Sequence, residues 1–181
     1  MNQGRLIAVV GPSGVGKDSL MLGIHAAVPE TRLVRRTITR APGMESEQYD
    51  SVSKPTFDEM VESGAFLLYW DAHGLSYGIP KAVATHVTHG TDCLVNLSRN
   101  VLPQAAEIFP SLVVLNITAS PEILAARLTA RGRETEGEIV ARLAQANKTL
   151  PEGLVVVEIS NDGPLRDTVA EAVALLQPAR A

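Results

Sequence analysis

One short segment, residues 11–19, constrains what this chain can fold into more than any other. It reads Gly-Pro-Ser-Gly-Val-Gly-Lys-Asp-Ser, and it stands between an apolar run and a stretch of helical period. Glycines let successive backbone N–H groups turn inward around phosphate oxygens, and a lysine and a helix N-terminus add positive charge. We therefore predict a nucleotide-phosphate site, here named the phosphate loop, formed by Gly11, Pro12, Ser13, Gly14, Val15, Gly16, Lys17, Asp18 and Ser19.

Asp18 is the unusual residue of the phosphate loop. The common pattern places Ser or Thr directly after the lysine, where the hydroxyl helps to hold Mg²⁺. A carboxylate stands there instead. Asp18 is therefore a candidate Mg²⁺ ligand, although an acidic residue in the first turn of a helix can also serve only as a partner of the helix dipole.

Composition and charge restrict the class of protein. A chain of 181 residues predicts one domain with a substantial core. A formal charge of −4 argues against nucleic-acid binding, and the single cysteine, Cys93, excludes a disulfide framework or a thiolate metal site. We see no signal peptide and no apolar run of the ~20 residues that span a bilayer. We expect a cytoplasmic protein that binds small molecules, with no nucleic-acid or membrane partner.

Apolar runs alternate with segments of helical period. The runs are nearly continuous, which is typical of buried parallel strands. The predicted strands are residues 6–10, 92–97, 112–117 and 154–159, and the predicted helices are residues 18–27, 80–89, 101–109, 121–130, 136–150 and 165–176. This alternation predicts an α/β fold of the P-loop NTPase type, with a parallel sheet flanked by helices and ligands at the carboxyl ends of the strands.

Two stretches interrupt the alternation. Residues 37–79 hold turn residues, a short helix at about 56–63 and an aromatic run at 66–70, which favours a small inserted subdomain over the phosphate loop. Residues 127–134 carry three arginines between two predicted helices, and a cationic loop facing a phosphate site suggests a lid. The single domain, residues 1–181, is thus expected to comprise a core (1–36 and 80–181), an insert (about 37–79) and a lid (about 127–137).

Several short strings resemble motifs of the guanylate kinase superfamily. They occur in the same order as in that superfamily and extend over most of the chain. They are Thr39-Arg40-Ala-Pro42, Tyr49-Asp-Ser-Val-Ser53, Tyr77-Gly78, Leu94-Val-Asn96-Leu-Ser98, and Arg131-Gly-Arg133 followed by Arg142. The resemblance implies a kinase whose insert binds the phosphorylated acceptor. The sequence also departs from the family pattern. Leu68 and Ser98 stand in place of the two carboxylates that recognise guanine, and Gly43 stands in place of a phosphate-binding arginine. These departures argue against GMP as the acceptor.

A narrower resemblance accounts for the departures. The phosphate loop, the string from Trp70 to Pro80, the string from Val95 to Arg99 and the string from Arg131 to Glu134 are similar to the ribose 1,5-bisphosphate phosphokinases of bacterial phosphonate degradation. This implies ATP-dependent formation of 5-phosphoribosyl 1-diphosphate (PRPP). The acceptor is then an ionised phosphate, so positioning and charge neutralisation suffice without a general base.

The resemblance also implies roles for individual residues. Lys17 would bridge the β- and γ-phosphates of ATP, and Arg131 and Arg142 would neutralise charge on the transferred group, with Arg133 a weaker candidate that could simply pair with Glu134. Asp18 would take over the Mg²⁺ role of a family aspartate that Asn96 replaces. The expected acceptor-binding residues are Arg36, Arg40, Tyr49, His73, Tyr77, Ser98 and Arg99.

Some alternatives stay open at this stage. Each arginine could be a solvated surface side chain, and Trp70 could pack on a sugar or fill the small core of the insert. The whole chain could be a nucleoside monophosphate kinase with altered base choice, or a binding module without catalysis. An intact phosphate loop with Gly11, Gly14, Gly16 and Lys17 favours an enzyme.

Overall fold

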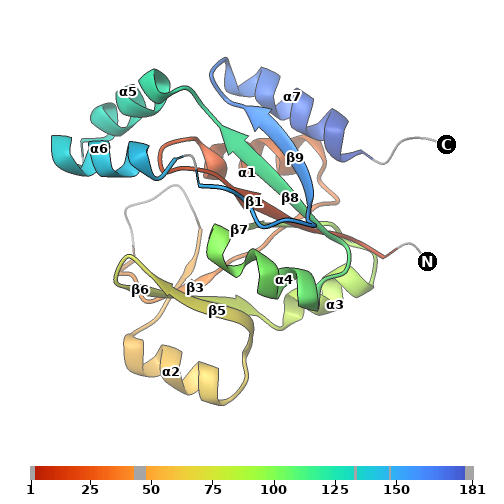
Figure 1. Ribbon diagram of the computed structural model, residues 1–181. Coiled ribbons are helices and arrows are strands. Elements are labelled where there is room, and N and C mark those ends of the chain that lie inside the picture. Colours follow the sequence, from red (N-terminus) through yellow and green to blue (C-terminus); the bar gives the residue numbers. More distant parts are fainter. Residues whose placement is uncertain (1–2, 43–47, 133, 147, 178–181) are drawn as a thin grey trace.

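Two sheets with their flanking helices make up the structure (Figure 1). The computed structural model describes residues 3–42, 48–132, 134–146 and 148–177. The larger sheet has the strand order β2-β7-β1-β8-β9 and is parallel throughout. Its strands are β1 (Leu6–Val10), β2 (Arg32–Leu33), β7 (Cys93–Asn96), β8 (Leu112–Thr118) and β9 (Val155–Ser160). The predicted α/β fold with a flanked parallel sheet is confirmed.

Alternate side chains of the central strand β1 enter two separate apolar clusters. Leu6 and Ala8 belong to the cluster that includes Leu102, and Ile7 and Val9 belong to the cluster that includes Leu20. Helices α3 (Ala82–Thr88) and α4 (Leu102–Ile108) supply the first cluster, and α1 (Lys17–Ala27) and α7 (Leu165–Leu176) supply the second. Burial on both faces explains why β1 is apolar without alternation.

Two further helices lie beyond the carboxyl end of β8, beside the phosphate loop (Figure 1). They are α5 (Pro121–Arg131) and α6 (Glu136–Ala144). A capping box fixes the start of α6, because the Thr135 hydroxyl accepts from the Glu138 backbone N–H and the Glu138 carboxylate accepts from that of Thr135. The Thr135 backbone N–H and the Thr135 hydroxyl both donate to the Glu138 carboxylate, and they lower its pKa.

The smaller sheet is built from the residues between β2 and α3. Its order is β4-β3-β6-β5, with β3 (Thr37–Ile38), β4 (Asp50–Ser51), β5 (Phe66–Ala72) and β6 (Leu75–Pro80). Helix α2 (Lys54–Glu62) covers its outer face, where the rings of Phe57 and Phe66 stack at 4.9 Å. A two-residue turn at His73 and Gly74, both with positive φ, joins β5 to β6.

Three expectations about these elements are wrong in detail. The helix predicted at 136–150 ends at Ala144, and much of the expected cationic loop is helical because α5 continues to Arg131. Strand β9 was expected to be buried, yet Val155 is 64% exposed. The reason is position, since β9 is an edge strand and an apolar run does not encode its place in the sheet. None of the described helices is long and apolar enough to cross a membrane.

Candidate active site

The phosphate loop turns tightly between β1 and α1, as predicted. Gly16 precedes α1 with a φ of 95°, a left-handed conformation that side chains disfavour. A Cβ at Gly16 would also stand 2.8 Å from Nδ2 of Asn161. The Nζ of Lys17 donates to the carbonyl oxygens of Gly11 (2.9 Å) and Pro12 (3.1 Å), so its ammonium lies across the loop.

Two side chains hold the phosphate loop from behind, in roles that no sequence motif predicts. Nδ2 of Asn161 donates to the carbonyl of Val15 at 2.8 Å, and Nη1 of Arg127 donates to the same oxygen at 3.3 Å. Nη2 of Arg127 also donates to the Asn161 carbonyl at 2.7 Å. Thr168 fixes the Asn161 amide by donating to Oδ1 at 2.8 Å. The one available signal is that Asn161 directly follows a strand at the ligand-binding edge of the sheet.

Asp18 and Asn96 are in contact. Nδ2 of Asn96 donates to Oδ1 of Asp18 at 3.3 Å, so the residue after the lysine meets the end of β7. A carboxylate beside an amide, at the mouth of a phosphate loop, fits Mg²⁺, which prefers one or two carboxylates together with substrate phosphates and water. Within the described part of the chain no three His, Cys, Asp or Glu side chains gather as a metal site, so substrate phosphates would have to supply further ligands.

Arg131 and Arg142 converge on one carboxylate. Arg131, at the end of α5, pairs with Oε1 of Glu134, and Nη2 of Arg142 lies 3.5 Å from the same oxygen. The Glu134 side chain is only 4% exposed. Nη1 of Arg142 also donates to the Ser13 hydroxyl at 2.5 Å, which brings α6 to the phosphate loop. Arg133 and Gly43 lie outside the described residues.

A stack of side chains faces inward from the smaller sheet. Trp70 and Tyr77 are paired across β5 and β6, and their rings are 5.3 Å apart and nearly parallel. The guanidinium of Arg36, which is only 6% exposed, lies 5.0 Å from the centre of the Tyr77 ring. Arg36 is thus not a solvated surface residue, and Trp70 packs within the sheet.

Arg40 joins the same group from the end of β3. Its Nη2 donates to the Tyr77 hydroxyl at 3.4 Å, and its guanidinium lies 5.5 Å from the centre of the Tyr49 ring. The Tyr49 hydroxyl donates to the Ala41 carbonyl at 2.7 Å. The structure therefore brings four predicted acceptor residues together, namely Arg36, Arg40, Tyr49 and Tyr77.

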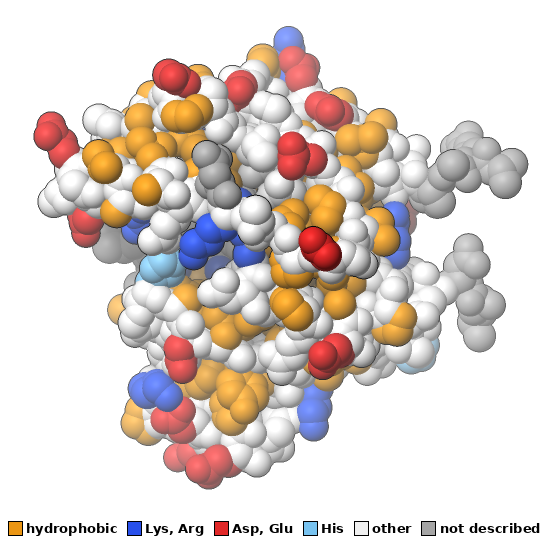
Figure 2. Space-filling model, in the orientation of Figure 1, with side chains coloured by type: hydrophobic (Ala, Val, Ile, Leu, Met, Phe, Trp, Pro, Cys, Tyr) orange, Lys and Arg blue, Asp and Glu red, His pale blue; other side chains and the backbone are white. Residues whose placement is uncertain are grey.

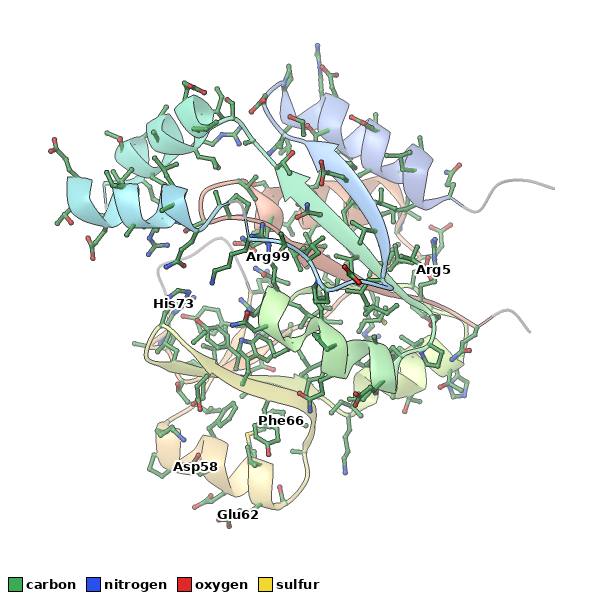
Figure 3. The ribbon with its side chains drawn as sticks, viewed as in Figure 1. Arg5, Asp58, Glu62, Phe66, His73 and Arg99 are labelled. Carbon is green, nitrogen blue, oxygen red and sulfur yellow. The ribbon has the colours of Figure 1, made fainter. Side chains whose placement is uncertain are left out.

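Ser98 and Arg99 follow β7 on the larger sheet, at the same edge as the phosphate loop. The Leu97 N–H donates to the Val9 carbonyl at 3.2 Å, so the segment that leads into Ser98 is held beside the end of β1. Burial lowers the pKa of the Arg99 guanidinium. His73 is exposed at the tip of the β5–β6 turn, and Figure 3 places Arg99 and His73 on opposite sides of the space between the two sheets. In Figure 2 basic side chains gather in a hollow between the upper and lower parts of the molecule.

Leu68 has no role in contacting a base. It is fully buried in the apolar cluster that contains Ile79 and Val83. The Leu68 side chain therefore offers no hydrogen-bond acceptor to a ligand.

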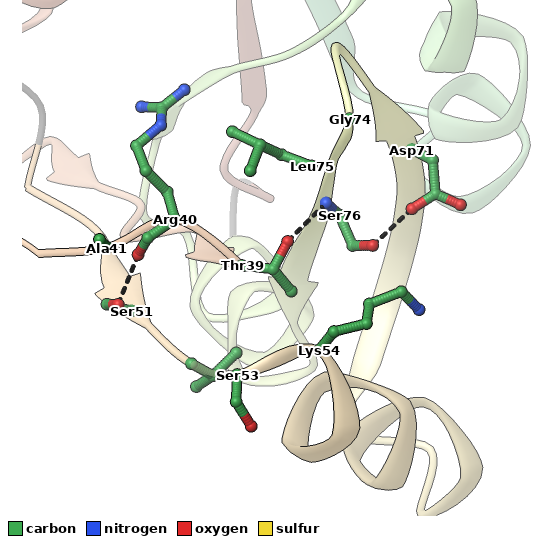
Figure 4. Close-up of a pocket in the computed structure, with 11 residues that line it drawn as sticks. Thr39, Arg40, Ala41, Ser51, Ser53, Lys54, Asp71, Gly74, Leu75 and Ser76 are labelled. Atoms are coloured by element: carbon green, nitrogen blue, oxygen red, sulfur yellow. Dashed lines mark hydrogen bonds between the residues drawn. The ribbon is translucent and has the colours of Figure 1, made fainter.

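A cavity of about 620 Å³ lies elsewhere on the smaller sheet (Figure 4). Asp71 and Ser76 line it, and they point away from the face that carries Trp70 and Tyr77 because side chains alternate along a strand. Arg40 contributes to its wall, but its guanidinium points away from Lys54 in Figure 4. We therefore place the chemistry at the phosphate loop and the inner face of the sheet.

A phosphate loop facing a cationic second sheet, with two arginines at its mouth, defines an α/β P-loop phosphokinase. The chain belongs to the guanylate kinase family, since the family model described as guanylate kinase matches residues 3–173. It is 52% identical over 180 residues to a ribose 1,5-bisphosphate phosphokinase PhnN of Ruegeria sp. (strain TM1040), covering 99% of this chain and 95% of the relative.

Other relatives agree with this placement. A protein of the same name from Rhizobium etli (strain CIAT 652) is 42% identical, with coverage of 96% of this chain and 90% of the relative. Among solved structures, a guanylate kinase from Anaplasma phagocytophilum matches with a TM-score of 0.67 at 17% identity, covering 96% of this chain and 85% of that one. This last likeness shows the fold alone.

Proposed function

We propose that this enzyme transfers the γ-phosphoryl group of ATP to the 1-phosphate of ribose 1,5-bisphosphate, giving PRPP and ADP. The observation that carries the proposal is an inner face built for phosphate and lacking base acceptors. Arg36 and Arg40 gather around Tyr77, while Leu68 is buried among apolar side chains. The names of the relatives that match nearly the whole chain support the same acceptor.

On the donor side, the phosphate loop binds the ATP phosphates. Backbone N–H groups from Gly14 to Lys17 enclose the β-phosphate, and the Lys17 ammonium reaches the β- and γ-phosphates. Arg127 and Asn161 keep the loop in shape through the Val15 carbonyl. These two residues therefore position the loop.

On the acceptor side, Arg40, Tyr49 and Tyr77 bind the phosphate that accepts the new group. Charge-assisted hydrogen bonds from a guanidinium suit a phosphate dianion, and the tyrosine hydroxyls add neutral donors. Arg36, Ser98, Arg99 and His73 complete the predicted acceptor site.

Transfer needs no proton abstraction. An oxygen of the 1-phosphate attacks the γ-phosphorus, the bond from that phosphorus to the β–γ bridging oxygen breaks, and the electron pair leaves with ADP. Two highly charged anions must approach each other, which makes neutralisation the main task. Arg131 and Arg142 perform it on the transferred group, and Glu134 orients both guanidinium groups.

Asp18 is the residue that would hold Mg²⁺, directly or through water, with the Asn96 amide beside it. Bound Mg²⁺ supplies charge neutralisation at the β- and γ-phosphate oxygens. Asn96 fixes the Asp18 carboxylate by donating to its Oδ1.

We assign the parts of the domain accordingly. Residues 1–36 and 80–181 form the ATP-binding core, residues 37–79 the acceptor-binding insert, and residues from about 127 to 137 a lid that covers the phosphates. The acidic net charge of −4 argues against a nucleic-acid partner and supports small-molecule substrates, and we propose a cytoplasmic enzyme without a membrane partner.

The test is an assay with ATP and Mg²⁺ in which ribose 1,5-bisphosphate and GMP are offered separately. We expect ADP release and PRPP formation with the sugar bisphosphate, and no turnover of GMP. Turnover of GMP in preference to the sugar would identify a nucleoside monophosphate kinase, and no transfer to either acceptor would contradict the proposal.

A further inference from the structure

Arg99 is half-buried and has no carboxylate partner among the described residues, unlike several other arginines. Arg5 pairs with Asp92, Arg35 with Asp50, and Arg131 with Glu134, whereas no carboxylate of the described residues lies within 4.0 Å of the Arg99 guanidinium. Nη1 of Arg99 donates to the Ala146 carbonyl at 3.2 Å. Its Nε is buried, and no described atom accepts a hydrogen bond from it.

Arg99 is half-buried with a buried Nε, and a cation that is partly removed from water is costly unless an anion or a ligand pairs with it. The Ala146 contact fixes the side chain but supplies no negative charge. Arg99 is therefore preorganised for an anion that comes from outside the described chain.

The position of Arg99 indicates which anion this is. Arg99 begins a short 3-10 helix, Arg99–Val101, at the end of β7 on the larger sheet. The proposed acceptor-phosphate group of Arg40, Tyr49 and Tyr77 lies on the smaller sheet, and Figure 3 shows Arg99 across the intervening space from His73. A ligand that engages both places must carry two separated anionic groups.

We infer that Arg99 binds the second phosphate of the acceptor, the one that is not phosphorylated, and so selects bisphosphates over monophosphates. The inference rests on the proposed function, because it takes the first phosphate to be held by the Arg40 group. Arg99 is then a specificity-determining residue. A planar guanidinium can give its Nε and its second terminal nitrogen to two oxygens of one phosphate.

The experiment measures two monophosphates as competitive inhibitors against ribose 1,5-bisphosphate. Ribose 5-phosphate carries only the phosphate assigned to Arg99, and ribose 1-phosphate carries only the accepting phosphate. In Arg99→Met we expect the inhibition constant of ribose 5-phosphate to rise by about tenfold or more, while that of ribose 1-phosphate stays within about twofold. Arg99→Lys should recover part of the loss, because it keeps the charge without the bidentate geometry.

The control is Arg166→Met, which removes an arginine whose side chain is 86% exposed at the start of α7. It should leave both inhibition constants unchanged. Thermal unfolding of each variant identifies any loss of folding, and Arg99→Lys keeps the test available if Arg99→Met is unstable.

The outcomes separate the two proposals. Equal weakening of both inhibitors, no change in either, or no inhibition of the wild-type enzyme by ribose 5-phosphate would overturn the assignment of Arg99. Absence of wild-type turnover with ribose 1,5-bisphosphate would instead overturn the proposed function.

Discussion

The guanidinium of Arg142 donates a hydrogen bond to the hydroxyl of Ser13 across 2.5 Å, joining α6 to the phosphate loop. The two residues are 129 positions apart in the chain. Arg142 also lies 3.5 Å from Glu134, so Ser13 and Glu134 together fix where its charge stands. A cation held at the rim of a phosphate loop is placed to stabilise charge on a transferred phosphoryl group.

Replacing Arg142 should therefore slow the chemical step. For Arg142→Met we expect kcat to fall by about 10²- to 10³-fold, with little change in the KM of the acceptor. Ser13→Ala should cost less than about tenfold, because substrate phosphates replace the hydroxyl as the partner of Arg142. Steady-state kinetics with both substrates varied would measure these effects. A large rise in acceptor KM in Arg142→Met would place the residue in the acceptor site instead.

Glu134 should act on the same step through its two partners. Glu134→Gln removes the negative charge that Arg131 and Arg142 share but keeps the shape of the side chain. We expect kcat to fall by about tenfold and acceptor KM to stay unchanged, since Arg131 loses a charged hydrogen-bond acceptor and Arg142 loses an ion-pair partner. As a control, Glu122→Gln alters an acidic residue in the first turn of α5 and should leave kcat unaltered.

Asp18 should control the requirement for Mg²⁺. In Asp18→Asn we expect the Mg²⁺ concentration that gives half-maximal activity to rise by about tenfold or more, because the site loses its carboxylate. The measurement is a Mg²⁺ titration at saturating ATP and acceptor. Asp58→Asn, on the distant helix α2, is the matched control. An unchanged Mg²⁺ titration in Asp18→Asn would leave Asp18 as a helix-dipole partner only.

Asn161 should stabilise the fold as well as the phosphate loop. It is 4% exposed, and Asn161→Ala would remove the donor to the Val15 carbonyl and the acceptor of the Thr168 hydroxyl. Buried groups left without partners typically cost about 1–3 kcal/mol each. We expect a lower free energy of unfolding by chemical denaturation and a raised KM for ATP. Stability equal to wild type would show that the loop is held without this amide.

Cys93 should be inert in the folded protein. Burial raises the pKa of its thiol to about 11, from 9.0 for an unperturbed group. The thiolate fraction at pH 8 is then about 100-fold lower than for an unperturbed thiol. Iodoacetamide should label the denatured protein quickly and the native protein very slowly. Because the folded state holds the thiol proton more tightly, stability should decline as pH rises above about 9.

Local signals gave most of the fold and the loop at its centre. Glycines, lysine and flanking apolar runs are short-range features, and β1 and α7 have the predicted bounds. The exposure of β9 was not predictable in this way, because central and edge strands share the same apolar composition.

Candidate residues were predictable only where a motif carried them. Arg36, Arg40, Tyr49 and Tyr77 do come together, and Asp18 does meet Asn96. The hydrogen bond between Val15 and Asn161 joins residues 146 positions apart, and no local sequence pattern predicts such a contact. The sequence suggests Arg133, which lies outside the described residues, as a partner of Glu134, and it does not predict the contacts of Glu134 with Arg131 and Arg142.

The chain leaves the larger sheet to form the smaller one and returns to the larger sheet at a single place. Strand β2 leads into the smaller sheet, and α3 returns the chain to β7, the immediate neighbour of β2 in the larger sheet. The strands β1 and β7, which support the phosphate loop, therefore pair with each other without any contribution from the smaller sheet. Substitutions can therefore accumulate in the smaller sheet, which faces the acceptor, while the ATP-binding larger sheet is kept. Members of one family can in this way come to use chemically different acceptors.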